Sequence, residues 1–144
     1  MLQAEALVGT WDLVAFTVAL PDGTTLHPMG KDARGRLMYG ADGRMAAMLS
    51  EASRAPLSTP RLEAYGKAPD AEKVGAFDSH LFYAGRFTIE GQTVVHHVEF
   101  ASVPNIVGLE QRRDALLEGD ALTLRYAVTS RRGTRHNILR WRRA

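Results

Sequence analysis

The chain has 144 residues, of which 45% are hydrophobic and 24% are charged, and its formal net charge is +2. This length and composition predict one globular domain over residues 1–144. The absence of cysteine excludes disulfides, thiolate metal sites and cysteine nucleophiles. The first residues lack a signal-peptide pattern, and no apolar run reaches the roughly 18–20 residues of a membrane helix. We therefore expect a cytoplasmic protein with no membrane partner.

The chain reads as a succession of strands joined by tight turns. Residues 7–20 are rich in β-branched and aromatic residues and end at the turn Pro21-Asp22-Gly23-Thr24. Extended residues follow at 25–39, interrupted by Pro28 and Gly30, and a hairpin turn leads into 44–49. Strands resume at 81–90, 93–103, 110–117, 121–129 and 134–142. This spacing predicts an all-β protein, an eight-stranded antiparallel up-and-down barrel whose first and last strands meet. Small barrels hold side chains or one small ligand inside.

Residues 50–78 differ from the rest of the chain. They hold Pro56, Pro60 and Pro69 and few β-branched residues, and they predict short helices at 58–63 and 70–77. We expect this short helical insertion between the third and fourth strands. Two roles remain open for it, a lid over one mouth of the barrel or a plain surface crossover.

Positive charge gathers near the C-terminus, in Arg131, Arg132, Arg135, Arg140, Arg142 and Arg143. Such a cluster can bind nucleic-acid phosphates, or it can form a solvated turn and the outer face of a final strand. Few aromatic residues are interleaved for base stacking. We favour the second interpretation and expect no nucleic-acid partner.

Several motifs resemble those of the lipocalin-like domain family, within the wider calycin group. They run over nearly the whole chain: Gly9-Thr10-Trp11, Pro28-Met29-Gly30, Phe77-Asp78-Ser79, Tyr83-Ala84-Gly85-Arg86-Phe87, Val95-His96-His97-Val98-Glu99 and the segment from Pro104-Asn105 to Gln111 and Arg113. The resemblance implies an eight-stranded barrel with a central cavity, and it leaves the activity open. Secreted lipocalins carry a signal peptide and usually a disulfide, so extracellular transport is not carried over to this chain.

The resemblance also implies a structural role for Gly9 and Trp11 at the closed end of the barrel. In lipocalins an arginine stacks on the tryptophan of the first strand. Here Arg140 or Arg142 can make that cation–π contact, and we expect Arg140 to make it.

His96 and His97 are the most chemically suggestive pair, and only one of them can face the interior because neighbouring strand residues point to opposite faces. The face of His96 is the more apolar one, which favours it as the core side; a polar cavity would reverse that expectation. If His97 and Glu99 point inward, they form a carboxylate-supported imidazole fit for general acid–base work. The alternative is that one histidine is exposed and the other is hydrogen-bonded in the wall.

Gln111 and Arg113 share one face of the following strand. Arg113 can pair with a carboxylate, steady an oxyanion or hold an anionic ligand; a solvent-side ion-pair ladder is the alternative. We take His97, Glu99 and Arg113 as candidate catalytic residues. The candidate ligand-binding residues are Tyr39, Tyr83, His97, Gln111 and Arg113.

The leading functional hypothesis is intracellular binding of a small hydrophobic or aromatic metabolite in the barrel. The second is a cofactor-independent isomerase, cyclase or hydratase with His97 as general acid or base, and a filled barrel with a structural role is the third. No Gly-x-Gly-x-x-Gly motif, Walker loop or metal-type histidine spacing occurs, so we expect no cofactor and no metal. A homodimer through barrel edges or the helical segment stays open.

Overall fold

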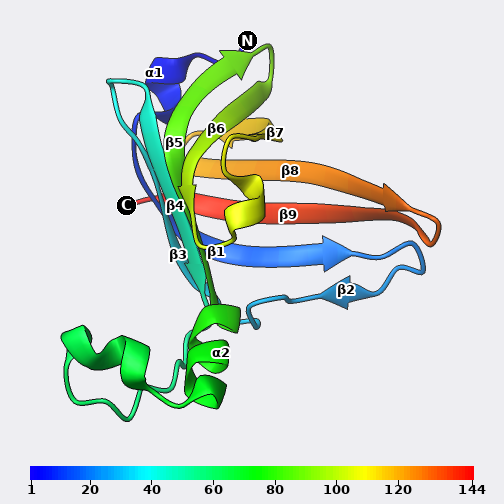
Figure 1. The fold of residues 1–144 in the computed structure, drawn as a ribbon. Helices are drawn as coiled ribbons and strands as arrows, with labels where there is room; N and C mark the ends of the chain where they lie inside the picture. Colours follow the sequence, from blue (N-terminus) through cyan, green and yellow to red (C-terminus); the bar gives the residue numbers. More distant parts are fainter.

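The computed structural model describes residues 1–144 and is built mainly of antiparallel strands (Figure 1). In chain order these are β1 (Gly9–Ala19), β2 (Thr25–Leu26), β3 (Arg34–Tyr39), β4 (Arg44–Ser50), β5 (His80–Glu90), β6 (Thr93–Ala101), β7 (Glu110–Glu118), β8 (Ala121–Ser130) and β9 (Gly133–Arg143). The helices are the short α1 (Ala4–Leu7), η1 (Leu62–Lys67), α2 (Asp70–Asp78) and η2 (Pro104–Ile106). None of these helices has the length and apolar character needed to cross a membrane.

Eight of the strands close into a barrel. β1 pairs with β3, and the strands from β3 to β9 follow as hydrogen-bonded neighbours in chain order. β9 then returns to β1, with Trp11 opposite Arg143 and Thr17 opposite Ile138. The expected meeting of the first and last strands in an eight-stranded antiparallel barrel is therefore confirmed.

The extended stretch expected at residues 25–39 is divided in two. Only Thr25 and Leu26 pair with the end of β1, as the extra strand β2. A turn follows, in which the Gly30 N–H donates to the His27 carbonyl at 3.0 Å. Pro28 offers no N–H to a strand ladder, so the sheet resumes only at β3.

The barrel interior follows the two-residue alternation of the strands. On β6, Val94, His96 and Val98 are buried, and on β9 Leu139 and Trp141 are. The intervening side chains of these two strands are more exposed, except for Val95 on β6, which is also fully buried. Side-chain parity along each strand therefore decides which residues reach the interior.

This alternation breaks where β5 meets β6. Ala84 lies opposite Phe100, whereas the next residue, Gly85, lies opposite Val98, so β6 carries one extra residue there. A Cβ on Gly85 would lie 1.9 Å from the carbonyl oxygen of His97, so only glycine fits this close approach. The bulge turns Phe100 outward, where 64% of it is exposed, although plain alternation would have placed it inside with His96.

One end of the barrel is closed around Trp11. Its indole N–H donates to the Leu7 carbonyl of α1 at 2.9 Å, and the Arg143 guanidinium stacks over its ring at 4.1 Å. The same guanidinium donates to the carbonyls of Ala6 and Val8 at 2.9 and 3.0 Å. The two ends of the chain thus seal this mouth together.

The stacking residue is Arg143, which corrects the expectation for Arg140. Arg140 and Arg142 are exposed because they alternate with the buried Trp141, whereas Arg143 has the inward parity. A Cβ on Gly9 would lie 2.8 Å from the Arg143 guanidinium. Glycine at that position therefore gives the arginine room over Trp11.

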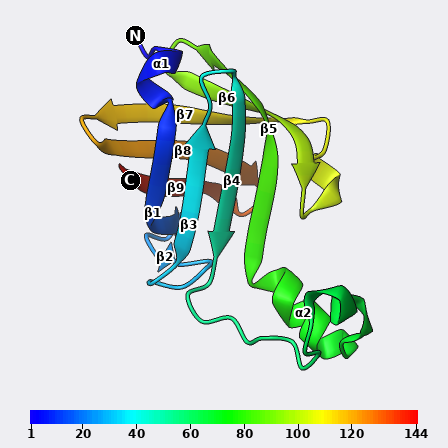
Figure 2. The ribbon, with the colours of Figure 1, turned by 90° about the vertical axis from the view of Figure 1, so that its left-hand side faces the viewer.

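The segment holding η1 and α2 lies between β4 and β5 and projects beyond the end of these two strands (Figure 2). No residue of either helix is buried, and Val74 and Phe77 are 57% and 48% exposed. Within the segment, Arg54 in the loop after β4 donates to Ser79 Oγ and the Ala76 carbonyl at the end of α2. The segment supplies none of the cavity-lining residues described below, and its role as a lid or a surface crossover stays a prediction.

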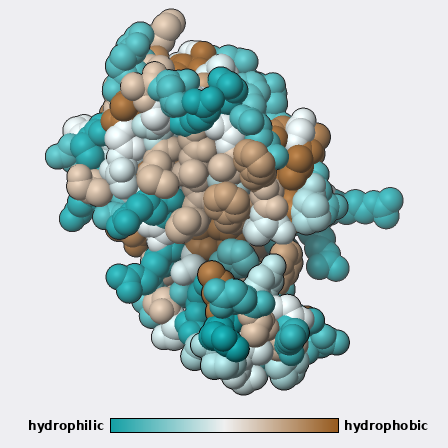
Figure 3. Space-filling model, turned by 60° about the vertical axis from the view of Figure 1, so that its left-hand side comes forward, coloured by the Kyte–Doolittle hydropathy of each residue, from teal (hydrophilic) through white to brown (hydrophobic).

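An apolar stretch covers part of the outer surface of β3, β4 and β5 (Figure 3). Met38 and Met48 are 39% and 47% exposed there. Both have outward parity, since their strand neighbours Leu37 and Leu49 are buried. A homodimer through the barrel edges or the helical segment stays open.

Candidate ligand-binding site

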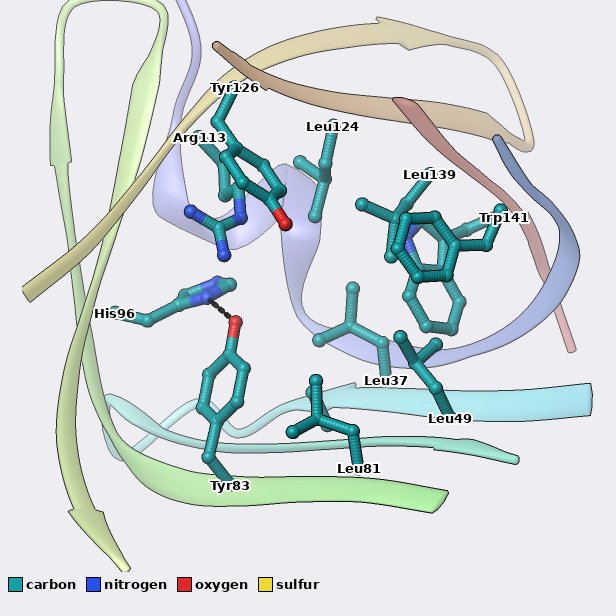
Figure 4. A pocket seen from close by; sticks show the side chains of 12 residues that line it. Leu37, Leu49, Leu81, Tyr83, His96, Arg113, Leu124, Tyr126, Leu139 and Trp141 are labelled. Atoms are coloured by element: carbon teal, nitrogen blue, oxygen red, sulfur yellow. Dashed lines mark hydrogen bonds between the residues drawn. The ribbon is translucent and has the colours of Figure 1, made fainter. Parts of the chain in front are cut away.

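The barrel encloses a cavity to which all eight of its strands contribute (Figure 4). Its lining side chains are Phe16, Leu37, Ala47, Leu49, Leu81, Tyr83, His96, Arg113, Leu124, Tyr126, Leu139 and Trp141. The cavity offers about 50 Å³ to the centre of a water-sized sphere. One water needs about 10–15 Å³ by that measure, so a few waters fit into the cavity as it stands.

The polar groups of the cavity gather on one wall. Figure 4 shows Tyr83, His96, Arg113 and Tyr126 pointing toward one another, while leucine side chains and Trp141 form the opposite side. Sites for small organic molecules commonly combine such an apolar surface with a few fixed polar groups.

His96 is held between two tyrosines. The Tyr39 hydroxyl lies 2.7 Å from Nε2, and the Tyr83 hydroxyl lies 2.7 Å from Nδ1. The histidine is 1% exposed, and the two tyrosines are 2% and 8% exposed. Both ring nitrogens are thus satisfied inside the barrel wall, which fixes the orientation of the imidazole.

Burial keeps His96, Tyr39 and Tyr83 uncharged. Desolvation lowers the pKa of His96 from 6.5 to about 3, and the nearby positive charge of Arg113 acts in the same direction. Desolvation also raises the pKa of Tyr39 well above 10.0 and raises that of Tyr83. At neutral pH the imidazole is therefore neutral and both hydroxyls keep their protons.

Arg113 is the charged member of the wall. It is 9% exposed, and its guanidinium stacks on the Tyr126 ring at 3.8 Å. It donates to the Arg112 carbonyl at 2.9 Å and to Gln111 Oε1 at 3.3 Å. No carboxylate pairs with it, because the acidic neighbours on β7, Glu110 and Asp114, have outward parity.

Arg112, the next residue along the chain, has the opposite environment. It faces outward and forms ion pairs with Glu90 and Glu110. An ion-pair ladder on the solvent side was the alternative expected for Arg113. The ladder exists, but it is formed by Arg112, whereas Arg113 lies inside the barrel.

His97 lies on the outer face of β6, which corrects its expected place in the cavity. Its Nε2 forms a hydrogen bond with Thr88 Oγ1 at 2.8 Å. Its Nδ1 lies 3.7 Å from a carboxylate oxygen of Glu110. Glu99 is also outside, 3.7 Å from Arg86. Since β6 alternates strictly up to Val98, placing His96 inside puts His97 and Glu99 outside.

The other expected ligand-binding residues all have inward parity. Tyr83 and Arg113 line the cavity, whereas Tyr39 lies behind His96 and is not part of the lining. Gln111 is half-buried and holds the guanidinium of Arg113. Whether any of them contacts a ligand stays a prediction.

Besides the aliphatic side chains and Phe16, three lining residues that carry a polar group were not predicted from the sequence. His96 was detectable, because its face of β6 is the more apolar one. Tyr126 shares the parity of the buried Leu122 and Leu124, and this signal was available on β8. Trp141 likewise shares the parity of Leu139, and no sequence pattern indicates that its indole N–H has no hydrogen-bond partner.

Part of this chain is similar to a curated protein. A stretch of 63 residues is 40% identical to the "4'-hydroxy-3'-methoxypropiophenone carrier protein ppsC" of Aspergillus oryzae, and the match covers 38% of this chain and 57% of that protein. This chain therefore matches little more than half the length of that curated relative. No solved structure matches the chain significantly.

The family comparison covers far more of the chain. Residues 8–144 match the lipocalin-like domain family, and these residues include every barrel strand and every residue that lines the cavity. The protein belongs to the lipocalin-like domain family.

Proposed function

We propose that the protein binds a small hydrophobic or aromatic molecule inside the barrel, with residues 1–144 acting as one binding domain. The observation that carries the proposal is the enclosed cavity, which is apolar over most of its lining and has Tyr83, His96 and Arg113 on one wall. The family membership and the partial similarity to a protein named as a carrier of an aromatic ketone support small-molecule binding in general.

Binding a substituted aromatic ring requires more room than about 50 Å³. Phe16 lines the cavity and also an outer hollow of about 650 Å³ that Val18, Val128 and Asn137 border. We propose that rotation of the Phe16 side chain joins the two spaces, because this side chain lines both of them. We therefore propose entry past Phe16, at the end of the barrel opposite Trp11.

Ligand titration tests the proposal directly. A panel of aromatic ketones and phenols, including 4'-hydroxy-3'-methoxypropiophenone, is added to the purified protein while heat release and melting temperature are recorded. A ligand at about 100 times its Kd is expected to stabilise the fold by about 2.7 kcal/mol.

A matched pair of variants locates the binding. Ala47→Leu fills the cavity, whereas Ala46→Leu adds the same atoms to the outer face of the same strand. We expect the first variant to lose binding and the second to retain it, with far-UV circular dichroism confirming that both fold. Binding that survives in the Ala47→Leu protein would place the ligand elsewhere, and a panel without any binder would count against the proposal.

The catalytic hypothesis required His97 and Glu99 in the cavity, but both lie on the outer face of the barrel. The interior histidine, His96, is a poor base at neutral pH because its pKa is about 3. The cytoplasmic location and the absence of cofactor, nucleic-acid and membrane partners stay predictions.

A further inference from the structure

The guanidinium of Arg113 is buried without a counter-ion. It lines the cavity and is 9% exposed, and it takes part in no salt bridge. Two of its five N–H donors are engaged by Arg112 and Gln111. Burying a charge without an opposite charge is unfavourable. A negatively charged group in the cavity would therefore be stabilised by this guanidinium.

The hydrogen bonds around His96 have a direction, which follows from counting donors. A neutral imidazole has one N–H and one acceptor nitrogen, so one tyrosine donates to it and the other accepts from it. The Tyr39 side chain is buried, and His96 is the hydrogen-bond partner of its hydroxyl. If this hydroxyl did not donate to Nε2, its O–H would be a buried donor without an acceptor, which is unfavourable. Tyr39 therefore donates to Nε2, and the Nδ1–H donates to Tyr83.

This direction leaves the Tyr83 hydroxyl proton free. Because Tyr83 lines the cavity, its O–H donates into that space. The Trp141 indole N–H belongs to another lining residue and has no partner. No lining side chain is a carboxylate or an amide, so the cavity presents donors and a positive charge but few acceptors.

Resting on the proposed binding function, we propose that the cavity selects an aromatic molecule with an anionic oxygen, which binds Arg113 and accepts the hydrogen bond of Tyr83. A phenolate and a carboxylate share this chemistry. The anion supplies the missing counter-charge and takes up the free donors of the wall. A neutral ligand of the same shape leaves the charge of Arg113 uncompensated.

Two probes of nearly the same shape test the charge requirement, 4-nitrophenol and 4-nitroanisole. Only the first can become an anion, and its visible absorbance reports the ionised form. Affinities are measured by calorimetry for the wild type and for Arg113→Met, with Arg112→Met as the control that removes the adjacent outward-facing charge. Tyr83→Phe tests the hydroxyl donor.

In the wild type we expect 4-nitrophenol to bind as the phenolate and about 10–100 times more tightly than 4-nitroanisole, the range of a charge-assisted hydrogen bond. Arg113→Met is expected to abolish this preference and the phenolate absorbance, Tyr83→Phe to reduce the preference, and Arg112→Met to keep both.

Three results would overturn the inference. Equal or tighter binding of 4-nitroanisole by the wild type removes the selection for an anion but leaves small-molecule binding intact. Equal loss in Arg112→Met and Arg113→Met shows a general surface-charge effect. If neither probe binds, neutral ligands from the panel decide the wider question: their binding refutes only the anion requirement, and their failure refutes the binding function as well.

Discussion

The substitution Arg113→Met distinguishes an arginine kept for a ligand from one kept for the fold. Methionine preserves much of the side-chain length and apolar contact, and it removes the charge. The loss includes the stack on Tyr126, which lies 3.8 Å away and is worth about 0.5–2 kcal/mol, and the hydrogen bonds to two neighbouring residues of β7. The gain is relief from the desolvation penalty of an unpaired buried ion, which is several kcal/mol.

These terms nearly cancel. We therefore expect the free energy of unfolding of ligand-free Arg113→Met to lie within about 1 kcal/mol of the wild type, an effect of about 2–4 °C on the melting temperature. Urea denaturation followed by far-UV circular dichroism measures it.

Arg143→Met is the matched comparison, because Arg143 donates to two carbonyls and stacks on Trp11. The free energy of unfolding of this variant is expected to be about 2–3 kcal/mol below that of the wild type. A loss above about 3 kcal/mol in Arg113→Met, the cost of breaking a compensated buried pair, would refute the view that its charge is uncompensated in the empty barrel.

Three further outcomes are expected. Because the pKa of His96 is about 3 in the folded protein and about 6.5 in the unfolded chain, the unfolded chain binds the proton first as the pH falls. His96 should therefore make stability decline between about pH 6.5 and pH 3, by up to about 4 kcal/mol; urea titrations of wild type and His96→Gln at several pH values check this, and equal slopes would contradict it. Gly85→Ala should lower the free energy of unfolding by more than about 3 kcal/mol, because its Cβ would lie 1.9 Å from a carbonyl oxygen. Gly75→Ala, on α2 where a Cβ meets open space, should raise the free energy of unfolding by about 0.5–1 kcal/mol. Chemical denaturation measures both, and equal effects would rule out the steric explanation. Phe16→Leu should speed association of 4-nitrophenol in stopped-flow measurements, with Val14→Ala on the exposed face as control, and an unchanged rate would argue against entry past Phe16.

The site has a cost for the empty protein. A wall of donors around an unpaired guanidinium does not stabilise a barrel that could otherwise be filled with apolar side chains. Functional sites often retain such locally unfavourable groups, and ligand binding offsets the cost because it acts only on the folded state. In the proposed complex, Arg113 would therefore link the stability of this protein to the occupancy of its cavity.

Much of the barrel was predictable because strand signals are local. Alternation and turn residues such as Pro21-Asp22-Gly23-Thr24 lie within a few positions of the elements they define, and β5 to β9 follow them closely. The parity of β7 likewise places Gln111 and Arg113 on one face. The parity of β6 also favoured His96 as the interior residue, whereas the catalytic hypothesis required His97 and Glu99 there.

The tertiary structure decided what depends on partners far along the chain. Closure of β9 on β1 brings Arg143, rather than Arg140, over Trp11. The extra residue opposite Gly85 turns Phe100 outward, and no pattern within β6 alone reveals a bulge that exists only in its pairing with β5. The sequence by itself determined most of the strands, most of their inward faces and a closed antiparallel barrel, because these depend on short-range periodicity. Only the closed barrel fixes which side chains of four strands converge in space. It brings Tyr39 and Tyr83 to His96, and it places no acidic side chain beside Arg113.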